Sequence, residues 1–192
     1  TSDNGPWLSY GNHAGSAGAF REGKGTTSEG GQRVPCLLEW KGVIPPGVVC
    51  NSITAGMDLL PTIVQATGAK MPAKKIDGVS LLEILKGDLS AAPRETMLFY
   101  YRKNSLEAVR HGNWKLVFDH PGRSNEGFSP GVDGLPGPGT ENLIQHGGLY
   151  DLRRDPGERY NVAFENPEVV ARLRKIADDA REELGDDIEG KD

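Results

Sequence analysis

The chain has 192 residues, of which 36% are hydrophobic and 26% charged, a composition typical of a globular protein. Its net charge of -5 gives no overall attraction to nucleic acid or to anionic lipid, so we expect neither nucleic acid nor membrane as a partner. The only two cysteines, Cys36 and Cys50, exclude a disulfide framework and a four-cysteine zinc site, although a single bridge stays open.

The first forty residues divide into a polar, glycine-rich stretch over 2–31 and an apolar run over 34–40. The apolar run predicts a buried strand, and Cys36 within it is expected to be a small buried hydrophobic residue. Apolar residues at helical spacing then predict a helix over residues 56–68, which Gly68 terminates. A shorter helix is predicted over residues 80–86, and it begins at Ser80.

The pattern changes from helical to alternating near Pro93. Three β-rich runs separated by short turns predict an antiparallel meander: 97–101, 106–110 and 114–118. Residues 119–148 are dominated by Gly, Pro, Ser and Asn, which predicts a long functional or mobile loop. A fourth strand is predicted at 149–152. A closing helix is predicted from Asn166-Pro167 to Gly185.

These elements indicate an α/β fold in two parts. We place the domain change near Pro93. Residues 1–93 are interpreted as an α/β piece, and residues 94–192 as a small four-stranded antiparallel sheet with one C-terminal helix that covers it.

A possible metal site lies at the start of the chain. Asp3 and Asn4 place a carboxylate beside an amide carbonyl, and both are hard oxygen ligands of the kind that calcium or magnesium prefers. The following Gly5 and Pro6 also favour an Asx turn, which needs no metal. On these residues alone, both interpretations stay open.

Lys24 is the candidate for anion binding. It lies between Gly23 and Gly25, where the backbone can approach a ligand closely and the ammonium acts as a point charge. A solvated loop lysine would have the same sequence. His13 and His146 lie in similar polar segments, and each is a candidate for substrate contact or a solvent-facing residue.

Arg33 immediately precedes the apolar run over 34–40. A guanidinium at this point suits pairing with a nearby carboxylate, and Asp3 and Glu29 are the candidates. We therefore interpret Arg33 as part of a structural ion pair.

Three segments together, TSDNGP, GKGTTSEGGQRVP and LYDLRRDPGERYN, resemble the sulfatase family in their order and spacing. The resemblance implies that Asp3 and Asn4 hold a calcium ion, with magnesium possible, and that Lys24 binds the sulfate of a sulfate ester during catalysis. It extends from Thr1 through the closing helix. It implies the C-terminal part of an alkaline-phosphatase-like α/β domain, followed by the antiparallel sheet.

The chain departs from the family at one essential point. Sulfatases oxidise the Cys or Ser of a C/S-x-P-x-R motif to formylglycine, and neither Cys36 nor Cys50 lies in such a motif. The resemblance implies that formylglycine and the other calcium ligands belong to a missing N-terminal half, the expected partner of this chain. The chain alone is expected to be inactive, to bind metal weakly, and to expose apolar surface near residues 34–40 that favours self-association. The family is commonly periplasmic, secreted or lysosomal.

Two other functions stay open. Phosphatases and phosphonate hydrolases of the wider alkaline phosphatase superfamily share related metal sites, although the GKGTTSEGG segment favours sulfate. A non-catalytic domain that binds carbohydrate or a partner chain would be supported by an aromatic platform. Trp7, Tyr10 and Phe20 are candidates for one, but burial against the missing half explains them equally well.

Overall fold

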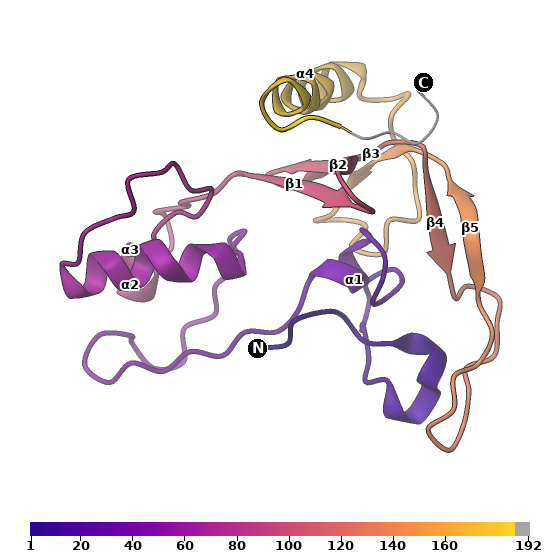
Figure 1. Cartoon of the computed structure of the whole chain (residues 1–192), viewed down its shortest axis with the longest axis horizontal. Helices are drawn as coiled ribbons and strands as arrows, with labels where there is room; N and C mark the ends of the chain where they lie inside the picture. The colour runs from indigo at the N-terminus through magenta and orange to yellow at the C-terminus, as the bar shows by residue number, and fades with distance from the viewer. Residues whose placement is uncertain (187–192) are drawn as a thin grey trace. The chain divides into compact units, whose positions relative to one another are not determined.

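The computed structural model describes residues 1–186, which form two compact units. The larger unit combines Thr1–Cys36 with the chain from Leu98 onward, and the smaller unit is Leu37–Met97. Figure 1 labels their helices and strands. The N-terminal segment therefore packs with the sheet of this chain. The predicted domain boundary between residues 93 and 94 stays a prediction.

A four-stranded sheet forms the centre of the larger unit. Its strands, in the order β1-β2-β3-β6, are β1 (Thr96–Tyr101), β2 (Ser105–His111), β3 (Trp114–Val117) and β6 (Gly148–Asp151). β3 runs antiparallel to both of its neighbours and pairs Leu116 with Val109 on one side and Leu149 on the other. These strands confirm the predicted meander and the predicted fourth strand.

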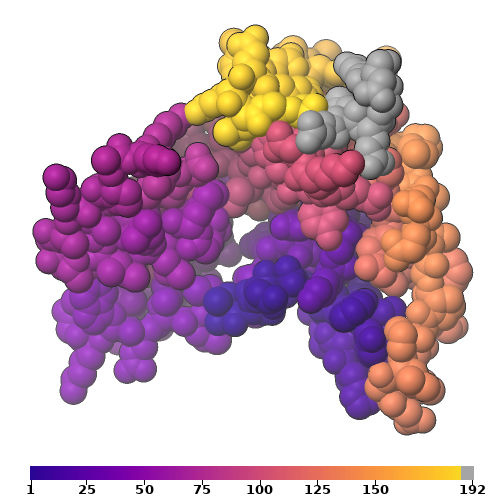
Figure 2. Space-filling view, viewed as in Figure 1, coloured from indigo at the N-terminus to yellow at the C-terminus, as the bar shows by residue number. Residues whose placement is uncertain are grey.

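Helix α4 (Pro167–Leu184) covers one face of this sheet, as Figures 1 and 2 show. Gly185, at φ 82°, follows its last residue, so both predicted ends are confirmed. Helix and strands share one core of buried residues: Leu106, Val109, Leu116, Leu149, Val169, Leu173, Ala177 and Ala180. Each buried leucine in this set contributes about 1.5–3 kcal/mol relative to exposure. None of the helices described is both long and apolar enough for a bilayer crossing.

The segment predicted as a long loop contains a β-hairpin. β4 (His120–Ser124) and β5 (Thr140–Gln145) pair antiparallel, so the prediction of a structureless connection over 119–148 was wrong. Gly, Pro and Ser have low strand propensity. Contacts with the N-terminal segment, and not the local sequence, stabilise the hairpin.

The hairpin is tied to the N-terminal segment through η1 (Leu8–His13). The N–H groups of Gly131 and Gly137, in the loop between β4 and β5, both donate to the Ser9 carbonyl at 2.7 Å. Figure 2 shows this loop in orange against the indigo segment. The conformation of η1 therefore depends on residues more than a hundred positions away.

The predicted strand over 34–40 does not form. Neither sheet of the described chain includes these residues, and a strand needs a neighbour to receive its backbone hydrogen bonds. Cys36 is exposed, so its predicted burial was wrong, and both it and Cys50 are free thiols. Leu37 is 89% exposed and Trp40 is 40% exposed, which confirms the predicted apolar surface.

The smaller unit contains η2 (Gly56–Asp58), α2 (Leu59–Thr67) and α3 (Leu82–Leu85). Gly68 follows α2 in the left-handed conformation, and the Ser80 hydroxyl accepts the N–H of Leu82 at 3.2 Å. Both predicted helices are therefore present, although α3 begins at Leu82, with Leu81 as its N-cap, and not at the predicted Ser80.

Asp58 holds the smaller unit together from its interior. Its fully buried carboxylate accepts the N–H groups of Ala55 and Val79 at 2.8 and 2.9 Å. Arg94 pairs with the same carboxylate. The paired charge and hydrogen bonds offset the cost of placing a carboxylate inside the protein.

Candidate functional site

The loop predicted to hold a metal lies beside the loop that carries Lys24. The N–H of Gly5 donates to the carbonyl of Gly31 at 3.0 Å. The N–H of Lys24 donates to the carbonyl of Pro6 at 2.9 Å. Two segments that are some twenty residues apart in sequence are therefore joined by direct backbone hydrogen bonds.

This contact requires glycine at two positions. A Cβ on Gly5 would lie 1.8 Å from the carbonyl oxygen of Gly30, and a Cβ on Gly23 would lie 2.2 Å from that of Pro6. Both distances are far inside van der Waals contact. The absence of a side chain is what allows the two loops to pack backbone against backbone.

Asp3 and Asn4 are exposed on the first of these loops. Their side-chain oxygens suit calcium, but calcium takes about six to eight oxygen ligands. Within residues 1–186, no three His, Cys, Asp or Glu side chains are grouped so that they could hold a metal. The pair therefore fits one part of a calcium site, and the site itself stays a prediction.

Lys24 is half-buried and lies against an aromatic side chain. Its Nζ is 5.4 Å from the centre of the Trp7 ring, in the geometry of a cation–π contact. The Tyr10 ring meets Trp7 edge to face, with 4.9 Å between the ring centroids. Lys24 thus presents its ammonium next to an exposed indole.

Glu22 fixes the loop on one side of Lys24. Its buried carboxylate accepts the hydroxyl of Ser124 and, at 3.1 Å, the N–H of Asn125. Glu22 has a φ of 57°, a left-handed conformation that costs a non-glycine residue about 1–3 kcal/mol. Contacts with the hairpin hold the residue in this conformation.

Glu29, in the short helix α1 (Glu29–Gln32), fixes the loop on the other side of Lys24. Its carboxylate pairs with Arg110 at 3.0 Å and with Lys115 at 3.2 Å. Its N–H donates to the Glu158 carboxylate at 2.7 Å. The loop is therefore attached both to the sheet and to residues 155–159, which we call the DPGER segment.

Lys115 is the centre of this attachment. Strand alternation places it on the face of β3 opposite Leu116, which packs in the core beneath α4. Its ammonium pairs with Glu158 at 2.9 Å, donates to the Thr27 carbonyl at 2.7 Å, and lies 4.5 Å from the centre of the Phe99 ring. These partners compensate for the complete burial of a lysine.

A second polar cluster lies under the same loop. The Thr27 hydroxyl donates to Glu107 at 2.8 Å, and His120 Nε2 is 3.1 Å from the same carboxylate. Burial raises the pKa of Glu107, while His120 and Thr27 act to lower it. The other carboxylate oxygen, Oε1, has no hydrogen-bond partner among the described residues.

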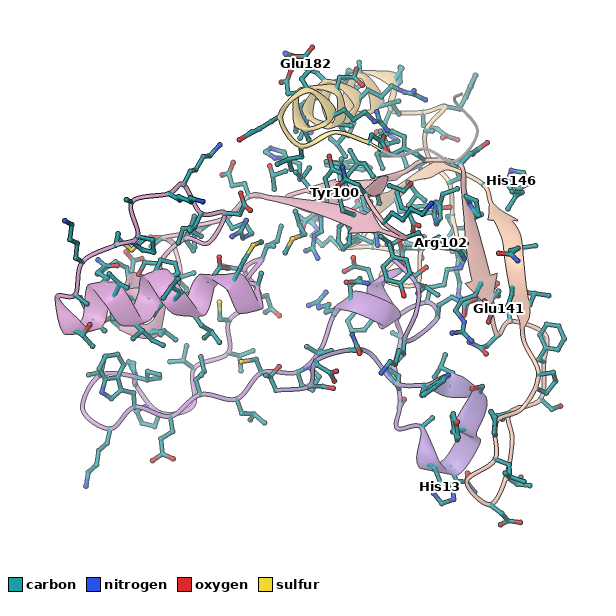
Figure 3. All side chains as sticks on the ribbon, in the orientation of Figure 1. His13, Tyr100, Arg102, Glu141, His146 and Glu182 are labelled. Atoms are coloured by element: carbon teal, nitrogen blue, oxygen red, sulfur yellow. The ribbon has the colours of Figure 1, made fainter. Side chains whose placement is uncertain are left out.

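The two candidate histidines are not brought together. Figure 3 shows His13 near the loop of the hairpin and His146 beyond the end of β5, and both are exposed. Substrate contact by either residue stays a prediction.

Arg33 lies with its guanidinium 4.7 Å from the centre of the Phe20 ring. Glu29, one of its two predicted partners, forms its ion pairs with Arg110 and Lys115. The ion pair of Arg33 stays a prediction.

Four buried charged residues that organise the site were not predicted from the sequence: Glu22, Glu107, Lys115 and Glu158. A signal for two of them was present, because Glu107 and Lys115 interrupt apolar runs in the predicted meander. A charge in such a position is either solvent-exposed or paired, and the single sequence does not identify the partner.

Two family models match the chain. One describes the C-terminal region of aryl-sulfatase and matches residues 92–189; the other describes the C-terminal part of N-sulphoglucosamine sulphohydrolase and matches residues 22–117. The chain is 39% identical to N-acetylgalactosamine-6-sulfatase of Sus scrofa, over 92% of this chain and 35% of the relative. It is 37% identical to arylsulfatase A of Homo sapiens, over 92% of this chain and 36% of the relative.

A solved structure shows the same fold. The PsFucS1 sulfatase from Pseudoalteromonas sp. superposes with a TM-score of 0.69 at 24% identity. The match covers 97% of this chain and 38% of that protein. At this identity the likeness concerns the fold alone, and the chain spans well under half of each of these proteins.

Proposed function

The chain belongs to the sulfatase family, and on that premise we propose that it is the C-terminal part of a sulfuric ester hydrolase in which Lys24 binds the sulfate group. The observation that carries the proposal is the direct pairing of the two loops. The hydrogen bonds from Gly5 to Gly31 and from Lys24 to Pro6 bring the Lys24 loop beside the predicted calcium ligands.

Lys24 contributes a fixed positive charge. Negative charge develops on the departing ester oxygen and on the sulfate oxygens, and a cation already in place stabilises it without reorganisation. Glu22 and Glu29 hold the loop on both sides of Lys24, so the backbone around it is rigid before substrate binds. The charge is therefore preorganised.

Asp3 and Asn4 would hold a calcium ion, or magnesium, together with ligands from the rest of a longer protein. When bound, the ion neutralises negative charge on the sulfate. The formylglycine nucleophile would also come from an N-terminal half, because the chain has no C/S-x-P-x-R motif. By itself the chain would then be inactive, and the N-terminal half would be its partner.

The proposal is tested with the full-length protein that contains this chain. Lys24→Ala is compared with Lys175→Ala, an exposed lysine of α4, for hydrolysis of 4-nitrophenyl sulfate and 4-nitrophenyl phosphate. We expect Lys24→Ala to lower kcat/KM for the sulfate ester by about 100- to 1000-fold, as for loss of one group that stabilises developing charge. Lys175→Ala should retain activity. Unchanged activity in Lys24→Ala, or a wild-type preference for the phosphate ester, would contradict the proposal.

A further inference from the structure

We infer that Trp7 forms part of the substrate site and contacts the ring that carries the sulfate ester. The inference rests on the proposed function, because it places this ring next to the sulfate that Lys24 binds. It assigns to the site a ligand class, an ester whose ring has an apolar face.

The positions of the two side chains carry the inference. A sulfate oxygen bound to the Lys24 ammonium lies about 2.8 Å from Nζ. The centre of the Trp7 ring lies 5.4 Å from the same nitrogen. A ring joined to that sulfate through one ester oxygen reaches the indole when the sulfate lies on the Trp7 side of the ammonium. Trp7 is 43% exposed in this chain.

Trp7 is held in place before any ligand arrives. The Tyr10 ring packs edge to face against it, and the Tyr10 N–H donates to the Trp7 carbonyl at 3.0 Å. The following residues of η1 are held by the β4–β5 loop through the Ser9 carbonyl. A rigid aromatic surface loses little conformational entropy when a ligand packs on it, which favours binding.

The two side chains also suit different parts of a sulfate ester. The face of an indole carries negative charge density, so it repels the sulfate and attracts the ammonium of Lys24. The apolar face of a pyranose or an aryl ring packs on the part of the indole that the ammonium leaves open. Lys24 therefore receives the anionic group, while Trp7 receives the ring.

Two other roles for Trp7 make different predictions. If Trp7 only positions Lys24 through the cation–π contact, then its loss weakens the binding of any sulfate, with or without a ring. If Trp7 only packs against another part of a longer protein, then its loss lowers stability and leaves substrate affinity unchanged.

The experiment uses the full-length protein and the variants Trp7→Ala and Trp7→Phe. Tyr160→Ala is the control, because it truncates an aromatic side chain of the same unit that is 72% exposed. KM and kcat are measured for 4-nitrophenyl sulfate and for N-acetylgalactosamine 6-sulfate, together with the inhibition constant of inorganic sulfate and the thermal midpoint. The two esters distinguish an aryl ring from a pyranose.

We expect Trp7→Ala to raise KM about tenfold for at least one ester, with the inhibition constant of inorganic sulfate unchanged. Trp7→Phe should restore most of the affinity, and Tyr160→Ala should behave as wild type. If KM rises for both esters, Trp7 contacts the apolar face that the two rings share. If KM rises for one ester alone, Trp7 contacts the ring of that ester.

An unchanged KM in an active protein, or a parallel loss of inorganic sulfate binding, would overturn the inference and leave the proposed function standing. A wild-type protein that releases sulfate from neither ester would remove the proposed function, and the inference with it.

Discussion

Lys115 and Glu29 form an ion pair of 3.2 Å in the interior of the larger unit, where their side chains are 0% and 2% exposed. The pair joins a strand of the sheet to the loop that carries Lys24. Glu158, 2.9 Å from the same ammonium, joins the DPGER segment to both. Because a buried charge without a partner is strongly destabilising, these three segments depend on one another.

The first prediction concerns this cluster. Lys115→Met removes the cation that pairs with Glu158 and leaves Glu29 paired with Arg110 alone, so we expect the free energy of unfolding to fall by about 3–5 kcal/mol. Urea denaturation followed by circular dichroism measures the change. Lys175→Met is the control, since its pair with Asp179 is exposed and its removal should change stability little. Equal effects of the two substitutions would show that the buried pair contributes no more than a surface pair.

The second prediction concerns the backbone contact between the two loops. Gly5→Ala places a Cβ against the Gly30 carbonyl, and the overlap should destabilise the protein by about 1–3 kcal/mol. Gly56→Ala is the matched control, because nothing lies within 4 Å of its Cβ position. Thermal unfolding compares the two variants. Equal stability would mean that the loops separate at little cost.

The third prediction concerns pH. Burial raises the pKa of Glu107 above its ordinary value of 4.5, with His120, Thr27 and Arg102 opposing the rise. The folded state then holds this proton more tightly than the unfolded state. The protonated Glu107 therefore adds to the free energy of unfolding. This contribution is fully present below pH 4.5 and is lost as pH rises through the raised pKa.

Glu107→Gln removes this titration. The unfolding free energy of the wild type, relative to the variant, should therefore fall as pH increases from 4.5. Chemical denaturation of both proteins at a series of pH values measures the difference. Thr27→Val should shift the fall to higher pH, because it removes a hydrogen bond that lowers the pKa. A difference that is constant with pH would exclude a shifted Glu107.

The fourth prediction concerns metal removal. In the full-length protein, chelation should abolish sulfate-ester hydrolysis and added calcium should restore it. Asp3→Ala removes a charged ligand, so the calcium concentration for half-maximal activity should rise more than about tenfold. Asp88→Ala, at an exposed turn, is the control. Titration of activity with calcium distinguishes the variants, and identical curves would exclude Asp3 as a ligand.

The parts of the fold that were predicted correctly are those whose pattern is local. The stripe of α4 shows the helical period, and Asn166, Pro167 and Gly185 mark its ends with their own backbone preferences. The meander follows from alternation and two short turns. These signals do not depend on distant residues.

The errors arise where a distant partner decides the outcome. The apolar run over 34–40 has the composition of a strand, but no described strand lies beside it. The opposite error was made over 119–148, where the Glu22 carboxylate and the Ser9 carbonyl hold a hairpin that the local sequence disfavours.

The candidate site shows the same limit. Asp3, Asn4 and Lys24 were predicted as site residues through a family resemblance, and their roles stay predictions, although backbone hydrogen bonds join their two loops. The buried charges that hold the Lys24 loop were missed, because a charged residue in a strand is usually exposed and its partner lies far away in sequence.

The anchors of the Lys24 loop also determine when it can form. Thr27 contacts a residue 80 positions later, Glu22 one 102 positions later, and Glu29 one 129 positions later. During synthesis the lysine leaves the ribosome long before these partners exist. The Lys24 loop therefore cannot complete its folded contacts until residue 158 has been translated, and an mRNA that ends earlier yields a chain that carries Lys24 without these anchors.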